Sequence, residues 1–161
     1  MKFTIHGLWP STHSFLQPEN CGTKPLPQMG GIESALKQDW PNLLDTNDTK
    51  FWTYEWMKHG TCSYMMPFDF FMLALDIYAR NDLQAILNNA GILSGGNYKR
   101  NYIISAIRRS VGANPQLVCS RASPKHVIEI RLCLDRNHIP RYINCPSQWS
   151  ACDNVTDLNF L

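Results

Sequence analysis

The chain has 161 residues, of which 44% are apolar and 17% are charged, and its formal net charge is +2. A chain of this length and composition can bury a hydrophobic core, so we expect a single domain over residues 1–161. No apolar run is long enough to span a bilayer, which argues against a membrane protein, and the small positive charge is compatible with a polyanionic substrate without requiring one.

The first half of the chain predicts one strand and three helices. "KFTIHGLW" is rich in β-branched and aromatic residues and predicts a strand that ends at Pro10, and residues 10–31 contain several Pro and Gly and predict a long loop. A short helix over 32–40 is expected to stop at Pro41. Asp48 or Thr49 is expected to cap a helix over 51–61, and a mostly buried helix is expected over 67–81.

The second half predicts two further helices and a pair of strands. Residues 82–91 predict a helix that stops at Gly91. An amphipathic helix over 97–112 is expected to turn one face inward and Arg108 and Arg109 outward; the inward residues are Tyr102, Ile103, Ala106 and Ile107. Alternation predicts a strand over 126–134, with 139–145 as its partner. This mixture of elements predicts an α+β fold.

The cysteines and two glycosylation sequons indicate an oxidising, secretory route. Six cysteines allow three disulfides in 15 pairings, and none of their spacings is C-x-x-C. Asn47 and Asn154 each begin an Asn-x-Thr sequon. Free thiols in a cytosolic protein are the alternative. No signal-peptide pattern precedes residue 3, so we expect a leader to be missing from this sequence.

The stretch "FWTYEWMKHGTC" carries the candidate chemistry. Helical spacing places Phe51, Glu55, Lys58 and His59 along one surface. Cleavage of RNA requires a base for the 2′-hydroxyl, an acid for the 5′-oxygen and a group that stabilises negative charge on phosphorus. His59 and His6 could act as the base and the acid. Lys58 with Glu55 could stabilise the negative charge, and no metal is needed.

Each of these residues also has a structural interpretation. Glu55 and Lys58 could form an exposed pair that contributes about 0.2–0.5 kcal/mol. A lone histidine is more often structural or on the surface, and this is the expectation for His13, His126 and His138. Trp9, Trp52 and Trp56 are more often core residues than base-stacking platforms.

Two long strings favour the catalytic interpretation. "FTIHGLWP" (3–10) and "FWTYEWMKHGTC" (51–62) resemble the two active-site segments of the ribonuclease T2 family. "LKQDWPNL", "DTKFW" and "INCP" are similar to the plant S-RNases, the style ribonucleases of self-incompatibility. The resemblance covers residues 3–152 and implies a ribonuclease T2-like fold with a central antiparallel sheet packed with several helices.

The resemblance also implies residue roles. His59 resembles the general base and His6 the general acid, while Glu55 and Lys58 resemble the pair that stabilises the pentacoordinate phosphate. Trp9, Phe51 and Tyr54 match substrate-binding positions. The implied reaction passes through a 2′,3′-cyclic phosphate, which water opens in a slower second step. The implied disulfides are Cys21–Cys62, Cys119–Cys152 and Cys133–Cys145.

Three departures from the family pattern qualify this interpretation. Tyr54 stands where many members have a phosphate-contacting histidine, and Ser11 stands where some members have an acidic residue near the base site. The strand and small disulfide loop that usually precede the first motif are missing. We therefore expect weaker substrate binding or slower turnover with an unchanged mechanism, and base preference is left open.

These features predict a secreted, monomeric endoribonuclease that acts on single-stranded RNA with no cofactor or metal. A role in self-incompatibility, with pollen F-box proteins as partners, is one biological setting, and an S-like housekeeping or stress ribonuclease is the other. A catalytically silent interaction or storage protein on the same fold is an alternative. A histidine-based metal protein is a further alternative, although the residues lack metal-ligand spacing.

Overall fold

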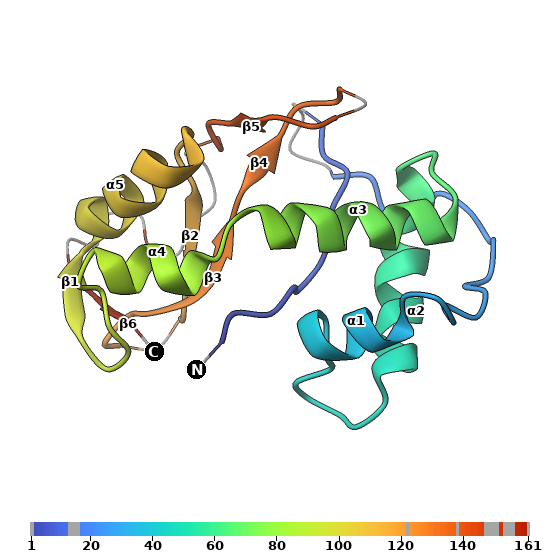
Figure 1. The fold of residues 1–161 in the computed structure, drawn as a ribbon, viewed down its shortest axis with the longest axis horizontal. Helices are drawn as coiled ribbons and strands as arrows, with labels where there is room; N and C mark the ends of the chain where they lie inside the picture. Colours follow the sequence, from blue (N-terminus) through green and yellow to red (C-terminus); the bar gives the residue numbers. More distant parts are fainter. Residues whose placement is uncertain are drawn as a thin grey trace. The chain divides into compact units, whose positions relative to one another are not determined.

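The computed structural model describes residues 2–12, 17–121, 123–137, 139–146, 152 and 157–160. It divides into two compact units, Phe3–Arg80 and Asn81–Leu161, with Met1–Lys2 assigned to the second. The first unit contains α1 (Glu33–Asp39), α2 (Asp48–Lys58), the short 3-10 helix η1 (Gly60–Cys62) and α3 (Pro67–Arg80) (Figure 1). Among the described residues, no helix is long and apolar enough to cross a bilayer.

An aromatic core holds the first unit together. Leu36, Trp40 and Trp52 are fully or almost fully buried, and Trp40 lies with its ring centroid 5.0 Å from that of Phe71 on α3. Trp56 packs edge-on against Phe70 at 5.6 Å. Trp52 and Trp56 are thus core residues, as their structural interpretation predicted, and Glu55 is buried with them on α2.

Residues 2–12 are not a strand, so the strand predicted over residues 2–9 is wrong. Their polar backbone groups bond to a helix end and to side chains instead of a neighbouring strand. Ile5 donates its backbone N–H to the Asp39 carbonyl at 2.7 Å, and the Phe3 carbonyl accepts from the Tyr78 hydroxyl at 2.6 Å. The segment is mostly partly buried, but composition could not identify its hydrogen-bond partners.

Helix α2 begins and ends slightly earlier than predicted. Asn47 is the N-cap, and its side chain accepts from the Lys50 backbone N–H at 2.9 Å, whereas Asp48 or Thr49 was expected in that role. The helix ends at Lys58, and the chain continues into η1. Helix α3 begins at Pro67 as expected, but only one face is buried: Phe70 and Phe71 are inside, whereas Phe68 is 47% exposed.

The second unit combines a four-stranded sheet with two helices. The strand order is β1 (Asn97–Lys99), β6 (Asp157–Phe160), β3 (His126–Arg131), β2 (Gln116–Cys119) (Figure 1). Pairs β1–β6 and β2–β3 are antiparallel, and β3–β6 is parallel. A separate two-stranded ribbon joins β4 (Cys133–Leu134) to β5 (Tyr142–Ile143). The strand predicted over 126–134 is therefore two strands, β3 and β4, and its predicted partner, 139–145, pairs through β5 with β4 and not with β3.

Helices α4 (Leu83–Asn89) and α5 (Arg100–Val111) complete the second unit. Gly91 follows α4 with φ +73°, which is the backbone conformation expected of a terminating glycine. Ile103, Ala106 and Ile107 face inward on α5 as predicted. Tyr102 was expected inside but is 44% exposed, because its hydroxyl reaches out to donate to the Ala90 carbonyl at 2.6 Å. The fold is α+β, as the sequence predicts.

Candidate active site

The backbone of His6 is fixed while its side chain stays exposed. The His6 carbonyl accepts a hydrogen bond of 2.9 Å from Nε1 of the buried Trp40. The imidazole ring lies 5.0 Å from the Trp9 ring, edge-on at 83°, and 6.4 Å from the Phe51 ring in a stacked orientation at 29°. The exposed imidazole therefore lies near two aromatic rings, one of which, Phe51, is on α2.

Trp9 connects the two motifs. Its ring centroid lies 5.7 Å from that of His59 as well as 5.0 Å from that of His6. Its Nε1 donates a hydrogen bond of 2.9 Å to Oε2 of Glu55, whose side chain is only 3% exposed. Gly7 allows this contact, because a Cβ at that position would overlap both Nε1 of Trp9 and Oε2 of Glu55. The indole therefore brings both imidazoles and the carboxyl group into one cluster.

The C-terminal end of α2 supplies the other groups. The predicted stripe of Phe51, Glu55, Lys58 and His59 is formed, although His59 is the C-cap rather than a helical residue. The His59 backbone N–H donates to the Glu55 carbonyl at 2.9 Å. The next residue must be glycine for steric reasons, because a Cβ at Gly60 would overlap the indole of Trp56.

Lys58 lies between an aromatic ring and a carboxylate. Its Nζ is 5.5 Å from the centroid of the exposed Tyr54 ring and 3.5 Å from Oε1 of Glu19. Tyr54 is the main cause that raises the pKa of Lys58 above its usual value, and the charge of Glu19 acts in the same direction, although partial burial opposes the shift. Lys58 is therefore a fixed positive charge over the whole neutral range.

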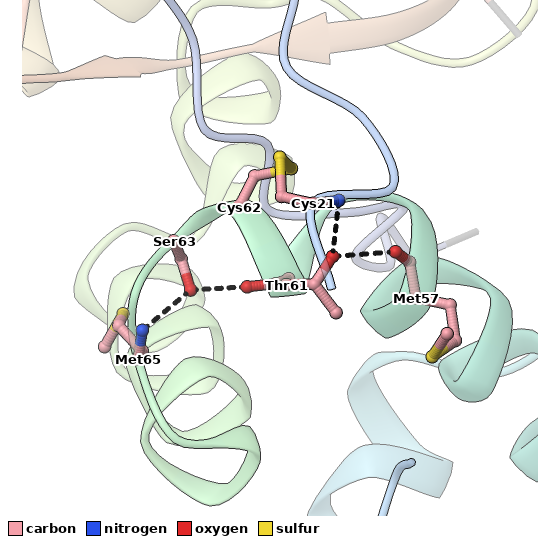
Figure 2. The surroundings of a disulfide bond; sticks show 7 residues. Cys21, Met57, Thr61, Cys62, Ser63 and Met65 are labelled. Carbon is pink, nitrogen blue, oxygen red and sulfur yellow. Dashed lines mark hydrogen bonds between the residues drawn. A yellow bond between two sulfur atoms is a disulfide. The ribbon is translucent and has the colours of Figure 1, made fainter. Parts of the chain in front are cut away.

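The loop that carries Glu19 is fastened to the same end of α2. Asn20 donates its backbone N–H to the Lys58 carbonyl at 2.8 Å. Figure 2 shows the next attachments: the Cys21 N–H donates to Oγ1 of Thr61 at 3.1 Å, and Thr61 donates to the Met57 carbonyl at 2.9 Å. The disulfide Cys21–Cys62 closes the same junction.

The environment of His59 favours its neutral form. Burial is the main cause that lowers the pKa of His59 below 6.5, and the charges of Lys58 and His6 act in the same direction. Glu19 opposes them by raising the pKa. An imidazole that is neutral near pH 7 can accept a proton, which is the property that a general base requires.

The cluster has the chemical parts for proton transfer at a phosphodiester. Two imidazoles can give and take protons, an ammonium can stabilise added negative charge, and a buried carboxyl group lies beside them. Among the described residues, no group of three or more His, Cys, Asp or Glu side chains is arranged to hold a metal ion.

The other predicted residues lie outside this cluster. His126 is at the start of β3 in the second unit, and its Nδ1 is buried without a hydrogen bond. Asn47 is exposed at the start of α2. His13, His138 and Asn154 lie outside the described residues. The structure has the three disulfides that the family resemblance implied: Cys21–Cys62, Cys119–Cys152 and Cys133–Cys145.

Sequence reasoning missed two residues that shape the cluster, Trp40 and Glu19. Trp40 was treated only as the end of a helix, yet it fixes the His6 carbonyl. Glu19 lies in the segment predicted to be a loop, far along the chain from Lys58. The signal for Glu19 was its position two residues before Cys21, because a Cys21–Cys62 disulfide brings that segment to the end of the second motif.

Comparison with known families matches the Ribonuclease T2 family over residues 1–145. The chain belongs to this family. Its ribonuclease T2 relatives include intracellular ribonuclease LX of Solanum lycopersicum, 34% identical over 89% of the chain, and ribonuclease S-1 of Pyrus pyrifolia, 35% identical over 89%. The chain spans 64% and 68% of these two relatives, respectively, so it covers less than two thirds of the first.

Solved ribonuclease T2 structures have the same fold. RNase NT, crystallised in complex with 5′-AMP, has a TM-score of 0.86 at 29% identity and covers 99% of this chain and 82% of its own. The SF11-RNase of Nicotiana alata, associated with gametophytic self-incompatibility, has a TM-score of 0.86 at 28% identity and covers 99% of this chain and 85% of its own.

Proposed function

We propose that this ribonuclease T2 protein is an endoribonuclease that cleaves single-stranded RNA by transphosphorylation, without a metal or cofactor. The observation that carries the proposal is the contact of one indole, Trp9, with the rings of both His6 and His59. Membership in the Ribonuclease T2 family supports the same activity. The relative solved with 5′-AMP gives further support for a nucleotide-containing substrate.

In the proposed first step, His59 acts as the base. The neutral imidazole removes the proton from the 2′-hydroxyl, and the 2′-oxygen attacks the adjacent phosphorus. The bond from phosphorus to the 5′-oxygen breaks, and the leaving oxygen takes a proton from His6. The products are a 2′,3′-cyclic phosphate and a free 5′-hydroxyl, and in the second step water attacks the cyclic phosphate with the two imidazoles in exchanged roles.

Lys58 and Glu55 are the proposed stabilisers of the pentacoordinate phosphate. The ammonium of Lys58 carries the charge that balances the developing dianion. Glu55 is oriented by the hydrogen bond that it accepts from Trp9, and in its protonated form the carboxyl group can donate to a phosphate oxygen. Phe51 and Trp9 are proposed to contact a base, and Tyr54 to bind phosphate through its hydroxyl in place of an imidazole.

Cleavage of single-stranded RNA in the presence of EDTA tests the proposal. The wild-type protein is expected to cleave, and His59→Ala and His6→Ala are each expected to lose at least about 10²-fold in kcat/KM, the usual contribution of a general base or acid. His126→Ala is the matched control, because it removes an imidazole from the second unit and is expected to retain activity. Absence of wild-type cleavage, or equal losses in all three variants, would refute the proposal.

We further propose that residues 1–161 fold as one ribonuclease T2 domain and that the protein is secreted as a monomer. Three disulfides and an exposed Asn47 sequon support an oxidising route. The Asn47 cap uses the side-chain oxygen, which leaves the amide nitrogen available for a glycan. Mass spectrometry of the protein from its natural source tests occupancy at Asn47 and Asn154.

The proposed biological setting is self-incompatibility, with pollen F-box proteins as partners. The pear relative named ribonuclease S-1 and the structural neighbour from Nicotiana alata support this setting. An S-like housekeeping or stress role is favoured by the tomato relative, which is named an intracellular ribonuclease. Tissue expression separates the two, because abundance restricted to styles supports the first and broad expression supports the second.

A further inference from the structure

We propose that Glu19 competes with the scissile phosphate for Lys58 and so sets how tightly the enzyme holds phosphate. This inference rests on the proposed function, in which Lys58 meets the phosphate. The two charged atoms are already close, since Lys58 Nζ lies 3.5 Å from Glu19 Oε1. A phosphate that approaches Lys58 therefore meets a carboxylate of like charge beside the ammonium.

The position of Glu19 is built into the fold. The next residue, Asn20, has a left-handed backbone with φ +56° and donates to the Lys58 carbonyl. Cys21 follows with a hydrogen bond to Thr61 and the disulfide to Cys62 (Figure 2). With two backbone attachments and one covalent bond within two residues, the start of the Glu19 side chain cannot drift away from the end of α2.

The ion pair between Lys58 and Glu19 is weak enough for a phosphate to displace Glu19 from Lys58. The side chains of Lys58 and Glu19 are 31% and 43% exposed, and partly exposed pairs are weak. The ammonium of Lys58 has three donors, so a phosphate can displace the carboxylate without leaving the ammonium unsatisfied. Removing the negative charge of Glu19 should tighten phosphate binding by about two- to five-fold, which corresponds to roughly 0.4–1 kcal/mol.

Glu19 also acts on the neighbouring imidazole. The charged groups that influence His59 are Lys58 and His6, which lower its pKa, and Glu19, which raises it. Without the Glu19 charge, the pKa of His59 is expected to fall further below 6.5. A residue with only a structural role would not move this pKa in a fixed direction, so the titration of His59 is a second readout.

The test compares Glu19→Gln with Glu33→Gln in the full chain. Glu33 is a matched control, because it is a carboxylate in a partly exposed ion pair with Lys37 on α1. The dissociation constant for inorganic phosphate is measured at low salt by NMR titration of the His59 ring resonances. Glu19→Gln is expected to bind phosphate two- to five-fold more tightly and to lower the pKa of His59, whereas Glu33→Gln is expected to match the wild type.

Unchanged or weaker phosphate binding in Glu19→Gln, or equal tightening in both variants, would overturn the inference. RNA cleavage by the wild type is measured separately. If the wild type cleaves RNA and Glu19→Gln binds phosphate no more tightly, the inference fails and the proposed function stands. If the wild type does not cleave RNA, the proposed function fails, and the phosphate comparison still decides the role of Glu19.

Discussion

The hydrogen bond from Trp9 to Glu55 predicts a measurable coupling between the two motifs. The acceptor is a carboxyl group only 3% exposed, and the bond length is 2.9 Å. An intramolecular hydrogen bond contributes about 0.5–1.5 kcal/mol net. In a chain of this size each kcal/mol changes Tm by about 2–4 °C, so loss of this bond is expected to lower Tm by about 1–6 °C.

A double-mutant cycle isolates this bond from the packing of the indole. Trp9→Phe is made in the wild type and in Glu55→Leu, and unfolding is followed by heat and by urea. The cost of Trp9→Phe should be larger in the wild type by about 0.5–1.5 kcal/mol, since only there does the indole N–H have this acceptor. Equal costs in the two backgrounds would show that the bond does not hold the motifs together.

Four further outcomes are expected. Because burial lowers the pKa of His59, the acidic limb of the kcat/KM profile should have its midpoint below pH 6.5, and a midpoint above that value would contradict His59 as the base. The same shift makes stability fall as the pH drops below 6.5, since the unfolded chain binds the proton more readily. Gly60→Ala should destabilise the protein by about 1–3 kcal/mol in urea unfolding because its Cβ meets Trp56; Gly30→Ala, which meets nothing within 4 Å, is the control, and equal costs would refute the steric argument. Asn47→Ala should cost about 0.5–2 kcal/mol in thermal unfolding of unglycosylated protein, whereas Asn47→Asp keeps a capping oxygen; equal losses in both would refute the cap.

Helix positions could be predicted well because their end signals are local. Pro41 and Gly91 stop helices where the sequence placed those stops, and Pro67 begins α3. The sequence did not predict β2 and β6, which have four residues each, or β1, whose three residues were predicted as the start of the helix over 97–112; strands this short carry little alternation to detect. The prediction of an N-terminal strand failed for a different reason. A strand-like composition does not reveal which acceptors the backbone N–H groups of the segment will bond to.

The sequence could predict the positions of site residues that lie on one helix, because helical spacing determines them. It could not predict the positions of site residues that are brought together by the tertiary fold. Spacing placed Glu55 and Lys58 on one face of α2, and the structure keeps them there. Trp9 could equally have been a core residue or a base platform on sequence grounds, and its contacts with both imidazoles depend on where the N-terminal segment docks. The position of Glu19 depends on the disulfide Cys21–Cys62, a pairing that cysteine spacing alone leaves open and that only the family resemblance implied.

Cleavage of a matched pair of dinucleotides tests the central claim most directly. One carries the 2′-hydroxyl next to the scissile phosphate, and the other has hydrogen in its place. In EDTA, the account predicts that the first is converted to a 2′,3′-cyclic phosphate and a free 5′-hydroxyl product, and that the second is left intact. Cleavage of the 2′-deoxy substrate would contradict attack by the 2′-oxygen, and with it the paired roles of His59 and His6.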